Sequence, residues 1–520
     1  MGRADQGERH ADRITIVAEK IRWHRDHVMT DFVSPTAPAQ ADQSSLVMMD
    51  AVALAAAIRA GDVSCIEVMT AYLDHIERIN PRVNAIVALQ DRTTLLVEAR
   101  EKDAQLERGD MPGPLHGFPH AVKDLFPVKG MRMTMGSPIF KDFVAPADNV
   151  AVSRLRKAGA IIIGKTNTPE FGLGSNTYNP VYGITSNAYD QSRSAGGSSG
   201  GAAVALALRM LPLADGSDYG GSLRNPAGWN NVFGFRTSFG RIPADGRDAW
   251  LPSMGVLGPM ARTVPDLAML LAVQAGYDDR VPLSMGEDPA VFHGPLETNL
   301  KGRRIAWAGD FNGAIPYEPG VLDLCKTTLK NFQSMGCIVE DAVPDYSIDK
   351  VWQAWLRLRA WQSGGGLLAL YNDPAKRALL KPEALFEIES GMKLSAFDIT
   401  AASAVRSEWY LAVRRFFEKY DYFILPSAQL FPFDVNLHWP REIAGQKMTT
   451  YHEWMKGMLP ITMAGCPALA APAGFNGQGL PMGIQIVAPN HAEVSCLQLA
   501  HAYDLETRWS TRLPSLLNRQ

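Results

Sequence analysis

The sequence has few cysteines, no long apolar runs and almost no net charge. Its five cysteines are scattered through 520 residues, and none forms a close pair with the spacing of metal ligands. Scattered cysteines in odd number predict reduced, mostly buried thiols, and therefore a cytoplasmic protein. No apolar run approaches the roughly 18 residues of a membrane span, and the N-terminus lacks the apolar core of a signal peptide. We therefore expect no membrane association.

Charge and histidine content exclude two further classes of protein. The chain carries 51 basic and 54 acidic residues, for a formal charge of -3. It therefore lacks the excess of positive charge that binding to a polyanion requires. Its 11 histidines include no His-Glu-x-x-His pattern and no other metal-binding cluster. We therefore expect neither a nucleic-acid partner nor a catalytic metal.

The first 46 residues differ from the rest of the chain. A charged stretch with some helical periodicity is followed by a segment rich in Pro, Ala, Gln and Ser that reaches Ser45. This composition predicts a tail or arm at 1–46. A targeting peptide is disfavoured by the acidic residues, and translation could instead begin at Met48 or Met49. The sequence does not separate these alternatives.

Beyond the tail, short apolar runs alternate with helical patterns. The expected strands lie at 160–163, 211–214, 304–307, 423–426 and 483–487, and the expected helices at 150–158, 202–208 and 319–335. This alternation predicts an α/β fold in which helices cover a sheet. Ser64, followed three residues later by Glu67, is typical of a capping box at a helix start. An aromatic stripe at helical spacing is interpreted as core, and consists of Trp352, Trp355, Leu356, Arg359 and Trp361.

Two familiar patterns occur in the chain but do not fit their usual function. Residues 159–166 match the expression for a phosphate-binding loop, yet the expected strand fills the variable positions and no clear helix follows. Residues 197–201 match the nucleophile elbow of hydrolases, with Ser199 in the centre. The polar flank at 191–195 cannot form the buried strand that such an elbow requires. Neither pattern therefore predicts the site.

Two glycine-rich loops are more informative, because each carries a serine. Ser198 lies in the loop 196–201 and Ser222 in the loop 218–224. The first loop has a structural explanation, since Ser199 could cap a small-residue helix that packs against the sheet. That explanation does not extend to the second loop. There the serine follows two glycines at a turn, among backbone N–H groups that could bind an oxyanion.

A lysine upstream of both loops lies in apolar surroundings. Lys123 follows Ala121 and Val122, and an apolar pair comes soon after it. A lone lysine is usually a surface cation, but an unpaired ammonium in such a setting is costly. Desolvation could lower its pKa from about 10.4 to about 7 or 8 and make it a neutral base. One lysine and two loop serines together suggest Ser/Ser/Lys acyl-transfer chemistry.

From about Met49 to Arg512 the chain resembles the amidase signature family of serine hydrolases. The resemblance rests on the lysine segment, on both glycine loops and on the stretches 79–85, 164–171, 258–262 and 480–485. It implies a single catalytic domain at 47–520 with an α/β/α fold and a central mixed sheet. It also implies a hydrolase that needs no cofactor or metal.

The resemblance implies a role for each reactive group. Ser222 would be the nucleophile, Ser198 a bridging serine on a cis peptide, and Lys123 the base. The oxyanion of the tetrahedral intermediate would be bound by backbone N–H groups, those of Tyr219, Gly220, Gly221 and Ser222. Asp218 and Arg224 are expected to pair and brace this loop.

The expected reaction is hydrolysis of a small-molecule carboxamide to a carboxylic acid and an amine or ammonia. An apolar or aryl substrate is suggested by a crowded segment that could also be plain core, namely Phe431, Phe433, His438, Trp439, Tyr451, Trp454 and Met458. Tyr219 stands where the family often has Thr, Ile or Leu, and its ring could reshape the pocket entrance. The resemblance also allows a homodimer.

Two alternatives stay open at this point. The chain could be the glutaminase component of a tRNA-dependent amidotransferase, its A subunit, which releases ammonia from glutamine for a partner subunit. It could also be a non-catalytic scaffold with a decayed site, although the presence of Lys123, Ser198 and Ser222 argues against this.

Overall fold

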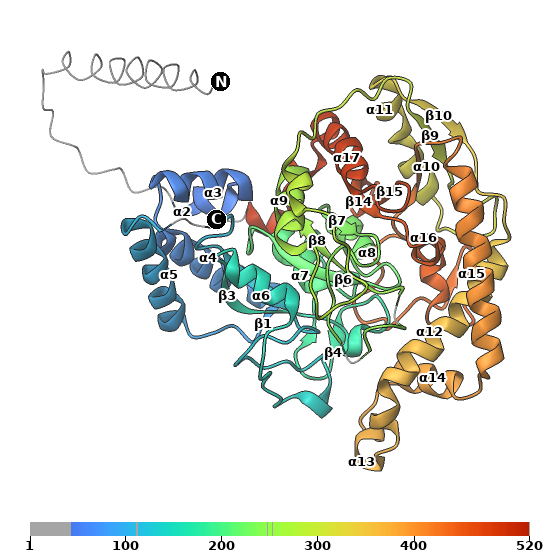
Figure 1. Cartoon of the computed structure of the whole chain (residues 1–520), viewed down its shortest axis with the longest axis horizontal. Coiled ribbons are helices and arrows are strands. Elements are labelled where there is room, and N and C mark those ends of the chain that lie inside the picture. The colour runs from blue at the N-terminus through green and yellow to red at the C-terminus, as the bar shows by residue number, and fades with distance from the viewer. Residues whose placement is uncertain (1–42, 111–112, 247, 252, 519–520) are drawn as a thin grey trace, which may run out of the picture. The chain divides into compact units, whose positions relative to one another are not determined.

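A mixed eight-stranded sheet forms the centre of the protein in the computed structural model (Figure 1). Its strands, in spatial order, are β10 (Ile338–Asp341), β9 (Arg304–Trp307), β11 (Tyr422–Pro426), β15 (Pro481–Val487), β14 (Ala468–Phe475), β7 (Phe233–Arg236), β8 (Val256–Ala261) and β6 (Ala214–Asp218). Strand β9 pairs in parallel with β10 and β11, and the other neighbours are antiparallel. Strand β6 therefore lies at one edge, and the chain that leaves it is the second glycine loop.

A smaller sheet lies against that edge. It has the order β1 (Ile86–Val87), β3 (Ile161–Thr166) and β2 (Pro119–Lys123), with β2 parallel to β3. Asp215 of β6 joins the two sheets: its Oδ1 lies 2.8 Å from His120 Nε2, and its Oδ2 accepts from the backbone N of Lys123 at 3.2 Å. These contacts place the carboxyl end of β2 beside β6.

Helices flank the sheets (Figure 1). They are α2 (Gln43–Met48), α3 (Ala51–Ala60), α4 (Cys65–Ile79), α5 (Arg92–Glu107), α6 (Val150–Lys157), α7 (Gly200–Ala207), α8 (Arg224–Trp229), α9 (Val264–Gln274), α10 (Val321–Thr327), α11 (Leu329–Ser334), α12 (Ile348–Tyr371), α13 (Pro374–Arg377), α14 (Pro382–Gly391), α15 (Ala396–Phe416), α16 (Leu459–Ala464) and α17 (Glu493–Thr507). Helices α8, α10 and α17 pack on β14 and β15, whereas the long helix α12 packs on α14 and α15. The predicted α/β fold with a central mixed sheet is confirmed.

Most predicted elements are present with small shifts in their bounds. Ser64 and Glu67 form the expected capping box at the start of α4. The strand predicted at 211–214 is wrong: β6 begins at Ala214 and contains three polar residues, Asp215, Ser217 and Asp218, of which the two aspartates are buried and Ser217 is partly buried. The helix predicted at 319–335 is two helices, α10 and α11, separated at Thr328.

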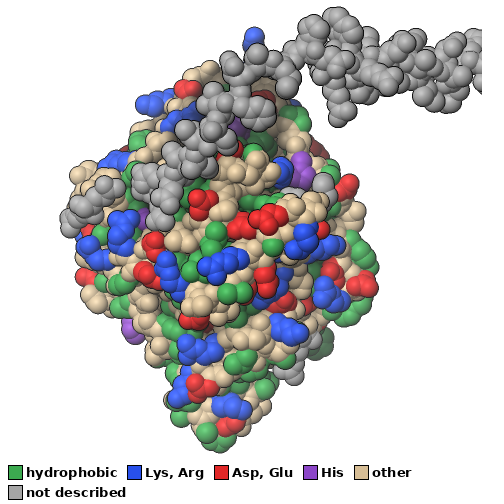
Figure 2. Space-filling model, turned by 90° about the vertical axis from the view of Figure 1, so that its left-hand side faces the viewer, with side chains coloured by type: hydrophobic (Ala, Val, Ile, Leu, Met, Phe, Trp, Pro, Cys, Tyr) green, Lys and Arg blue, Asp and Glu red, His purple; other side chains and the backbone are tan. Residues whose placement is uncertain are grey.

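The structure describes residues 43–110, 113–246, 248–251 and 253–518, and Gln43–Gln520 forms one unit. The periodicity predicted within the N-terminal tail falls outside the described residues, and α2 crosses the predicted boundary at residue 46. All five cysteines are buried free thiols. Within the described residues, each helix is too short or too polar to span a bilayer. Basic and acidic side chains are interspersed over the face shown in Figure 2.

Candidate active site

Both glycine loops and the ends of two strands meet at the edge of the central sheet. Lys123 is the last residue of β2, and Ser217 lies near the end of β6. Ser222 lies in the loop between β6 and α8, while Ser198 lies in the loop before α7. The lysine and both loop serines are buried. The fold thus brings together the three residues that the sequence predicted to react.

The lysine amine is surrounded by hydroxyl groups. Lys123 Nζ donates to Ser198 Oγ at 2.8 Å, to Ser199 Oγ at 2.8 Å and to Ser217 Oγ at 3.1 Å. Three acceptors match the three N–H bonds of an ammonium, whereas a neutral amine has two N–H bonds and one lone pair and can accept from one of these hydroxyls. The site can therefore hold the lysine in either protonation state.

Burial gives the lysine the electrostatics of a base. Desolvation of the charged form lowers the pKa of Lys123 to about 7, although the carboxylates of Asp215 and Asp218 act in the opposite direction. At neutral pH, a large fraction of the amine is therefore unprotonated and able to take a proton. This agrees with the pKa expected from its apolar sequence neighbours.

The first glycine loop holds its serine against the lysine. The Gly197–Ser198 peptide is cis, as the resemblance implies. Close packing requires the neighbouring glycine, because a Cβ at Gly197 would lie 2.9 Å from the backbone N of Asn176. The backbone N of Ser199 donates to the carbonyl O of Ser222 at 3.1 Å, and this bond ties the two loops together.

Sequence reasoning missed two of the three hydroxyls around the lysine. Ser199 was expected to cap α7, but it makes no side-chain cap and its Oγ accepts from Lys123. Ser217 was not singled out at all. The sequence held a signal for both, because a buried lysine needs hydrogen-bond partners. Ser199 lies one residue after Ser198, and Ser217 lies five residues before Ser222.

A buried carboxylate braces the second glycine loop. Asp218 accepts from Arg224 Nε at 3.0 Å and Nη2 at 2.9 Å, and from Arg236 Nη1 at 3.3 Å. Burial alone would raise the pKa of this carboxyl, but the two guanidinium groups hold it well below its usual range. Asp218 also accepts from the backbone N–H groups of Gly221 at 3.0 Å and Leu223 at 3.1 Å, so it fixes the turn that carries the serine.

These bonds alter one detail of the predicted oxyanion site. Because Gly221 already donates its N–H to Asp218, only Tyr219, Gly220 and Ser222 are left from the predicted set of four amides. Gly221 has φ +101°, and a Cβ there would lie 2.5 Å from Met458 Cγ. This glycine therefore shapes the turn instead of supplying a donor.

A cavity of about 360 Å³ opens beside the serines. Ser198, Ser217 and Ser222 line this cavity, and Trp355 and Arg359 of α12 form its helical wall. The core interpretation is confirmed for Trp352 and Trp355, which are buried and stack with ring centroids 5.6 Å apart. Trp355 also lines the cavity, together with the buried Arg359.

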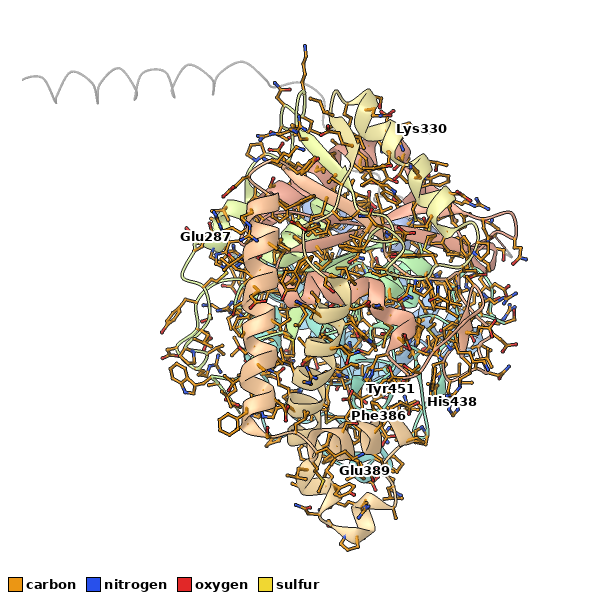
Figure 3. The ribbon with its side chains drawn as sticks, turned by 90° about the vertical axis from the view of Figure 1, so that its right-hand side faces the viewer. Glu287, Lys330, Phe386, Glu389, His438 and Tyr451 are labelled. Carbon is orange, nitrogen blue, oxygen red and sulfur yellow. The ribbon has the colours of Figure 1, made fainter. Side chains whose placement is uncertain are left out.

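The aromatic segment that could have walled the pocket does not line this cavity. Its neighbours His452 and Met455 do so instead. Phe433 and Trp454 pack edge to face in the core, with ring centroids 5.4 Å apart. Tyr451 lies beside Phe386 of α14 (Figure 3), with ring centroids 5.8 Å apart. Core packing thus accounts for Phe433, Tyr451 and Trp454, whereas His438 is exposed and stacks on Tyr178 with ring centroids 4.5 Å apart.

A charged network holds the helical wall of the cavity, formed by α12, in place. Arg359 donates from Nε to Glu387 Oε1 at 2.8 Å, and its guanidinium lies 4.5 Å from the centroid of the Tyr219 ring. His452 Nε2 lies 2.8 Å from the same carboxylate oxygen. Burial would raise the pKa of Glu387, but Arg359 lowers it to about 2, so the carboxylate stays charged and balances the arginine.

Comparison with known proteins agrees with this geometry. Residues 67–497 match the family model described as Amidase. The chain is 32% identical over 476 residues to an acylamidase of Rhodococcus erythropolis, covering 91% of this chain and 98% of that protein. It is 31% identical over 490 residues to the A subunit of the glutamyl-tRNA(Gln) amidotransferase of Methylococcus capsulatus, covering 89% and 98% of the two chains.

A solved structure shows the same fold. The crystal structure of a bacterial aryl acylamidase of the amidase signature family superimposes with a TM-score of 0.83 at 25% identity, covering 91% of this chain and 99% of that one. The chain therefore belongs to the amidase family. It is a hydrolase of amide C–N bonds, and its substrates are small amides.

Proposed function

We propose that the protein hydrolyses carboxamides through an acyl-enzyme on Ser222, with Ser198 and Lys123 as a proton relay. One observation carries this proposal: the amine of a fully buried lysine bonds to Ser198 Oγ at 2.8 Å and, among the described residues, forms no ion pair. Its pKa near 7 suits a general base at neutral pH.

Acylation begins with two coupled proton transfers. Neutral Lys123 takes the proton of Ser198 Oγ while Ser198 takes the proton of Ser222 Oγ. The freed electron pair of Ser222 Oγ forms a bond to the carbonyl carbon, and the carbonyl π pair moves onto oxygen. Backbone N–H groups of Tyr219, Gly220 and Ser222 bind this oxyanion, and one such donor typically contributes about 10²-fold to 10³-fold in kcat.

Collapse of the tetrahedral intermediate releases the amine. The oxyanion pair re-forms the carbonyl, the C–N bond breaks, and the leaving nitrogen receives the proton that Lys123 returns through Ser198. Water then attacks the acyl-enzyme with the same base, and Ser222 leaves with its proton restored. The products are a carboxylic acid and an amine or ammonia.

We propose an apolar or aryl amide as substrate. The cavity wall supports this, because Trp355, Leu125 and Phe171 present apolar surface near the serines. The acylamidase names of two similar proteins agree with such a substrate. We further propose a cytoplasmic location, which the five unpaired buried thiols support. The homodimer stays a prediction that sedimentation velocity would test.

Similarity to the glutaminase component of amidotransferases favours one alternative. In that role the purified chain would prefer glutamine, and partner subunits would co-purify with it. Trp355 and Phe171 on the cavity wall fit an apolar group better than the charged α-ammonium and α-carboxylate groups of glutamine.

The test is release of acid and amine from glutamine, aliphatic amides, anilides and cyclic amides by wild type and by Ser222→Ala. We expect Ser222-dependent turnover of aryl or apolar amides by the single chain. Turnover of glutamine alone would select the amidotransferase role. Absence of turnover on every amide, together with no labelling of Ser222 by a fluorophosphonate, would leave the non-catalytic scaffold.

A further inference from the structure

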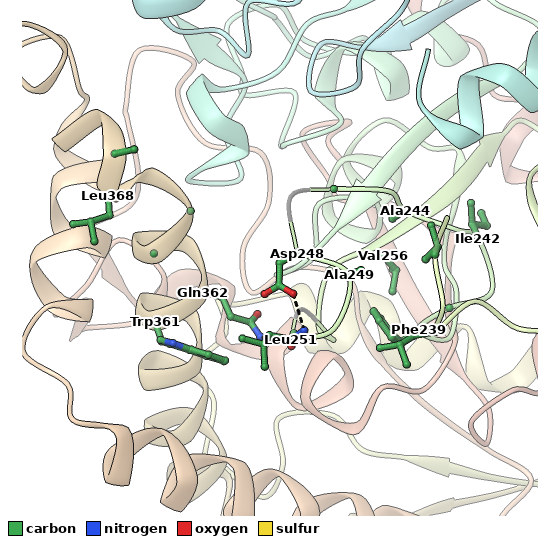
Figure 4. A pocket seen from close by; sticks show the side chains of 18 of the residues that line it. Phe239, Ile242, Ala244, Asp248, Ala249, Leu251, Val256, Trp361, Gln362 and Leu368 are labelled. Atoms are coloured by element: carbon green, nitrogen blue, oxygen red, sulfur yellow. Dashed lines mark hydrogen bonds between the residues drawn. The ribbon is translucent and has the colours of Figure 1, made fainter. Parts of the chain in front are cut away.

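Figure 4 shows a second and larger hollow. It adjoins the active-site cavity, because the two share lining residues. Its volume is about 750 Å³, and its surface is mainly apolar. Trp361 and Leu368 of α12 lie on one side, and Phe239, Ile242 and Val256 lie on the other (Figure 4). The proposed mechanism uses none of these residues.

The two hollows share part of their wall. Gln362 and Gly366 of α12 line both of them. Gln362 is held in place at this boundary, because Tyr219 Oη donates to its Oε1 at 2.7 Å and its Nε2 donates to the carbonyl O of Leu251 at 3.4 Å. Since Tyr219 lies on the serine loop, the boundary is fixed directly to the catalytic centre.

Consecutive glycines in α12 form one side of the boundary. Glycine in a helix interior is destabilising relative to alanine, so three in a row at 364–366 require an explanation. Packing explains Gly364, since a Cβ there would lie 2.6 Å from the carbonyl O of Glu387. Packing does not explain Gly365 and Gly366, where a Cβ would meet no atom within 4 Å.

The missing side chains leave space along the helix. Gly365 lines only the larger of the two hollows, whereas Gly366 lines both. A bulky side chain at either position would project into space that the structure keeps open. Gly365 and Gly366 thus leave the exposed surface of α12 open where the two hollows share their wall, beside the fixed side chain of Gln362.

We propose that the larger hollow holds the apolar end of the amide substrate, which extends from Ser222 past Gly366 and Gly365. This inference rests on the proposed function and narrows its substrate class to amides with an extended apolar acyl or amine group. The size of the two spaces agrees with it: about 360 Å³ is near the lower end for a ligand pocket, and the adjoining 750 Å³ accommodates a long chain or a fused aryl group.

The first test measures chain-length dependence in the wild-type protein. One series keeps aniline and varies the acyl group through acetyl, hexanoyl and dodecanoyl; the other keeps acetyl and varies the amine through aniline, naphthylamine and dodecylamine. Each buried methylene is worth roughly a fourfold gain, so we expect kcat/KM to rise at least about 100-fold along one series. Turnover that depends on Ser222 but is flat along both series would overturn the inference and leave the proposed function intact.

The second test fills the hollow. Gly365→Leu should lower kcat/KM for the long amide about 30-fold or more, because the new side chain occupies the space of several methylenes. Ala401→Leu, at an exposed position of α15 outside both hollows, is the matched control and should leave kcat/KM unchanged for both the long and the short amide. Gly365→Ala checks folding, and its melting temperature should not fall. An unchanged ratio of long to short amide in Gly365→Leu would contradict the proposal.

Binding separates the inference from the proposed function. Calorimetry of dodecanoyl anilide with Ser222→Ala, which cannot acylate, should show binding that Gly365→Leu weakens by about tenfold or more. Such binding, if wild type turned over no amide, would support the larger hollow as a binding site and contradict the proposed function. No binding of the long amide would sink the inference.

Discussion

Two buried lysines lie on neighbouring strands of the small sheet, and their surroundings differ. Lys123 ends β2, and Lys165 lies on β3, next to Thr166, which is the residue opposite Lys123 in the strand pair. Both side chains have no exposed surface. Burial lowers the pKa of both amines, to about 7 for Lys123 and to about 8 for Lys165.

The partners of the two amines are of different kinds. Lys165 Nζ donates to the carbonyl O of Phe126 and lies 4.0 Å from Asp124 Oδ1, so a fixed carboxylate balances its charge. Lys123 bonds to three hydroxyls, of which those of Ser198 and Ser217 belong to residues that line the cavity. Burial alone therefore does not make a base. In the proposed mechanism, the hydroxyl path to the cavity distinguishes Lys123, the proposed base, from Lys165.

The largest expected effect is the loss of activity when Lys123, the proposed base, is replaced. Lys123→Met should lower kcat/KM by about 10⁴-fold, since it removes the base for both half-reactions. It should not lower the melting temperature, because methionine fills similar space without a charge to desolvate. Steady-state kinetics and thermal unfolding on the same preparation check both statements. Activity within tenfold of wild type would show that the base lies elsewhere.

The same substitution at the structural lysine should give the opposite result. Lys165→Met leaves Asp124 buried without its cation, so the free energy of unfolding should fall by about 3 kcal/mol. Among folded molecules, kcat/KM should stay within about tenfold of wild type. Denaturant unfolding measures the loss, and the double variant Lys165→Met with Asp124→Asn should recover most of it. A stable but inactive Lys165→Met protein would contradict the assignment.

The pH dependence of stability sharpens the comparison further. Lys123 has a pKa of about 7 when folded and about 10.4 when unfolded, so between these values the unfolded chain binds a proton that the folded chain does not. Rising pH therefore stabilises the fold, by up to about 1.4 kcal/mol per pH unit in this window, and the contribution is constant below it. The difference in the free energy of unfolding between wild type and Lys123→Met, measured with denaturant at several pH values, isolates this slope. For Lys165 this window begins near pH 8. If the free energy of unfolding of Lys123→Met and of Lys165→Met depended on pH in the same way, the proposed difference between the two lysines would be refuted.

The smallest expected effect concerns the hydroxyls themselves. Ser217→Ala removes one acceptor of the ammonium, so kcat/KM at neutral pH should change by no more than about tenfold. The loss should also move the acidic limb of the pH profile to lower pH, since the charged form of Lys123 is less well held. Kinetics as a function of pH, with Ser407→Ala on the exposed surface of α15 as control, measure both. A shift to higher pH would contradict the hydrogen-bond account.

The reactive core of the site was predictable because it depends on local chain chemistry. Lys123 stands in an apolar run and each loop serine stands among glycines, which singled out these residues, whereas the family resemblance implied the role of each. Strand β6 was misplaced, because Asp215 and Ser217 are polar and their partners, His120 and Lys123, lie 95 and 94 residues earlier in the chain.

The helical wall of the cavity could not be predicted from local sequence. Trp355 and Arg359 lie more than a hundred positions beyond Ser222, and their spacing fits a core helix equally well. Only the packing of α12 over the serine loop decides that they face the cavity. The glycines of α12 have the same ambiguity, since the hollow that explains Gly365 is formed by loops from another part of the chain.

The most direct test of the central claim is the rate of fluorophosphonate labelling as a function of pH, from about pH 5 to pH 9, with intact-mass detection and peptide mapping. We predict a single adduct on Ser222, whose rate of formation rises with a midpoint near pH 7 and is lost in Lys123→Met but not in Lys165→Met. An adduct on another serine, a flat pH profile, or labelling that survives the loss of Lys123 would contradict the account.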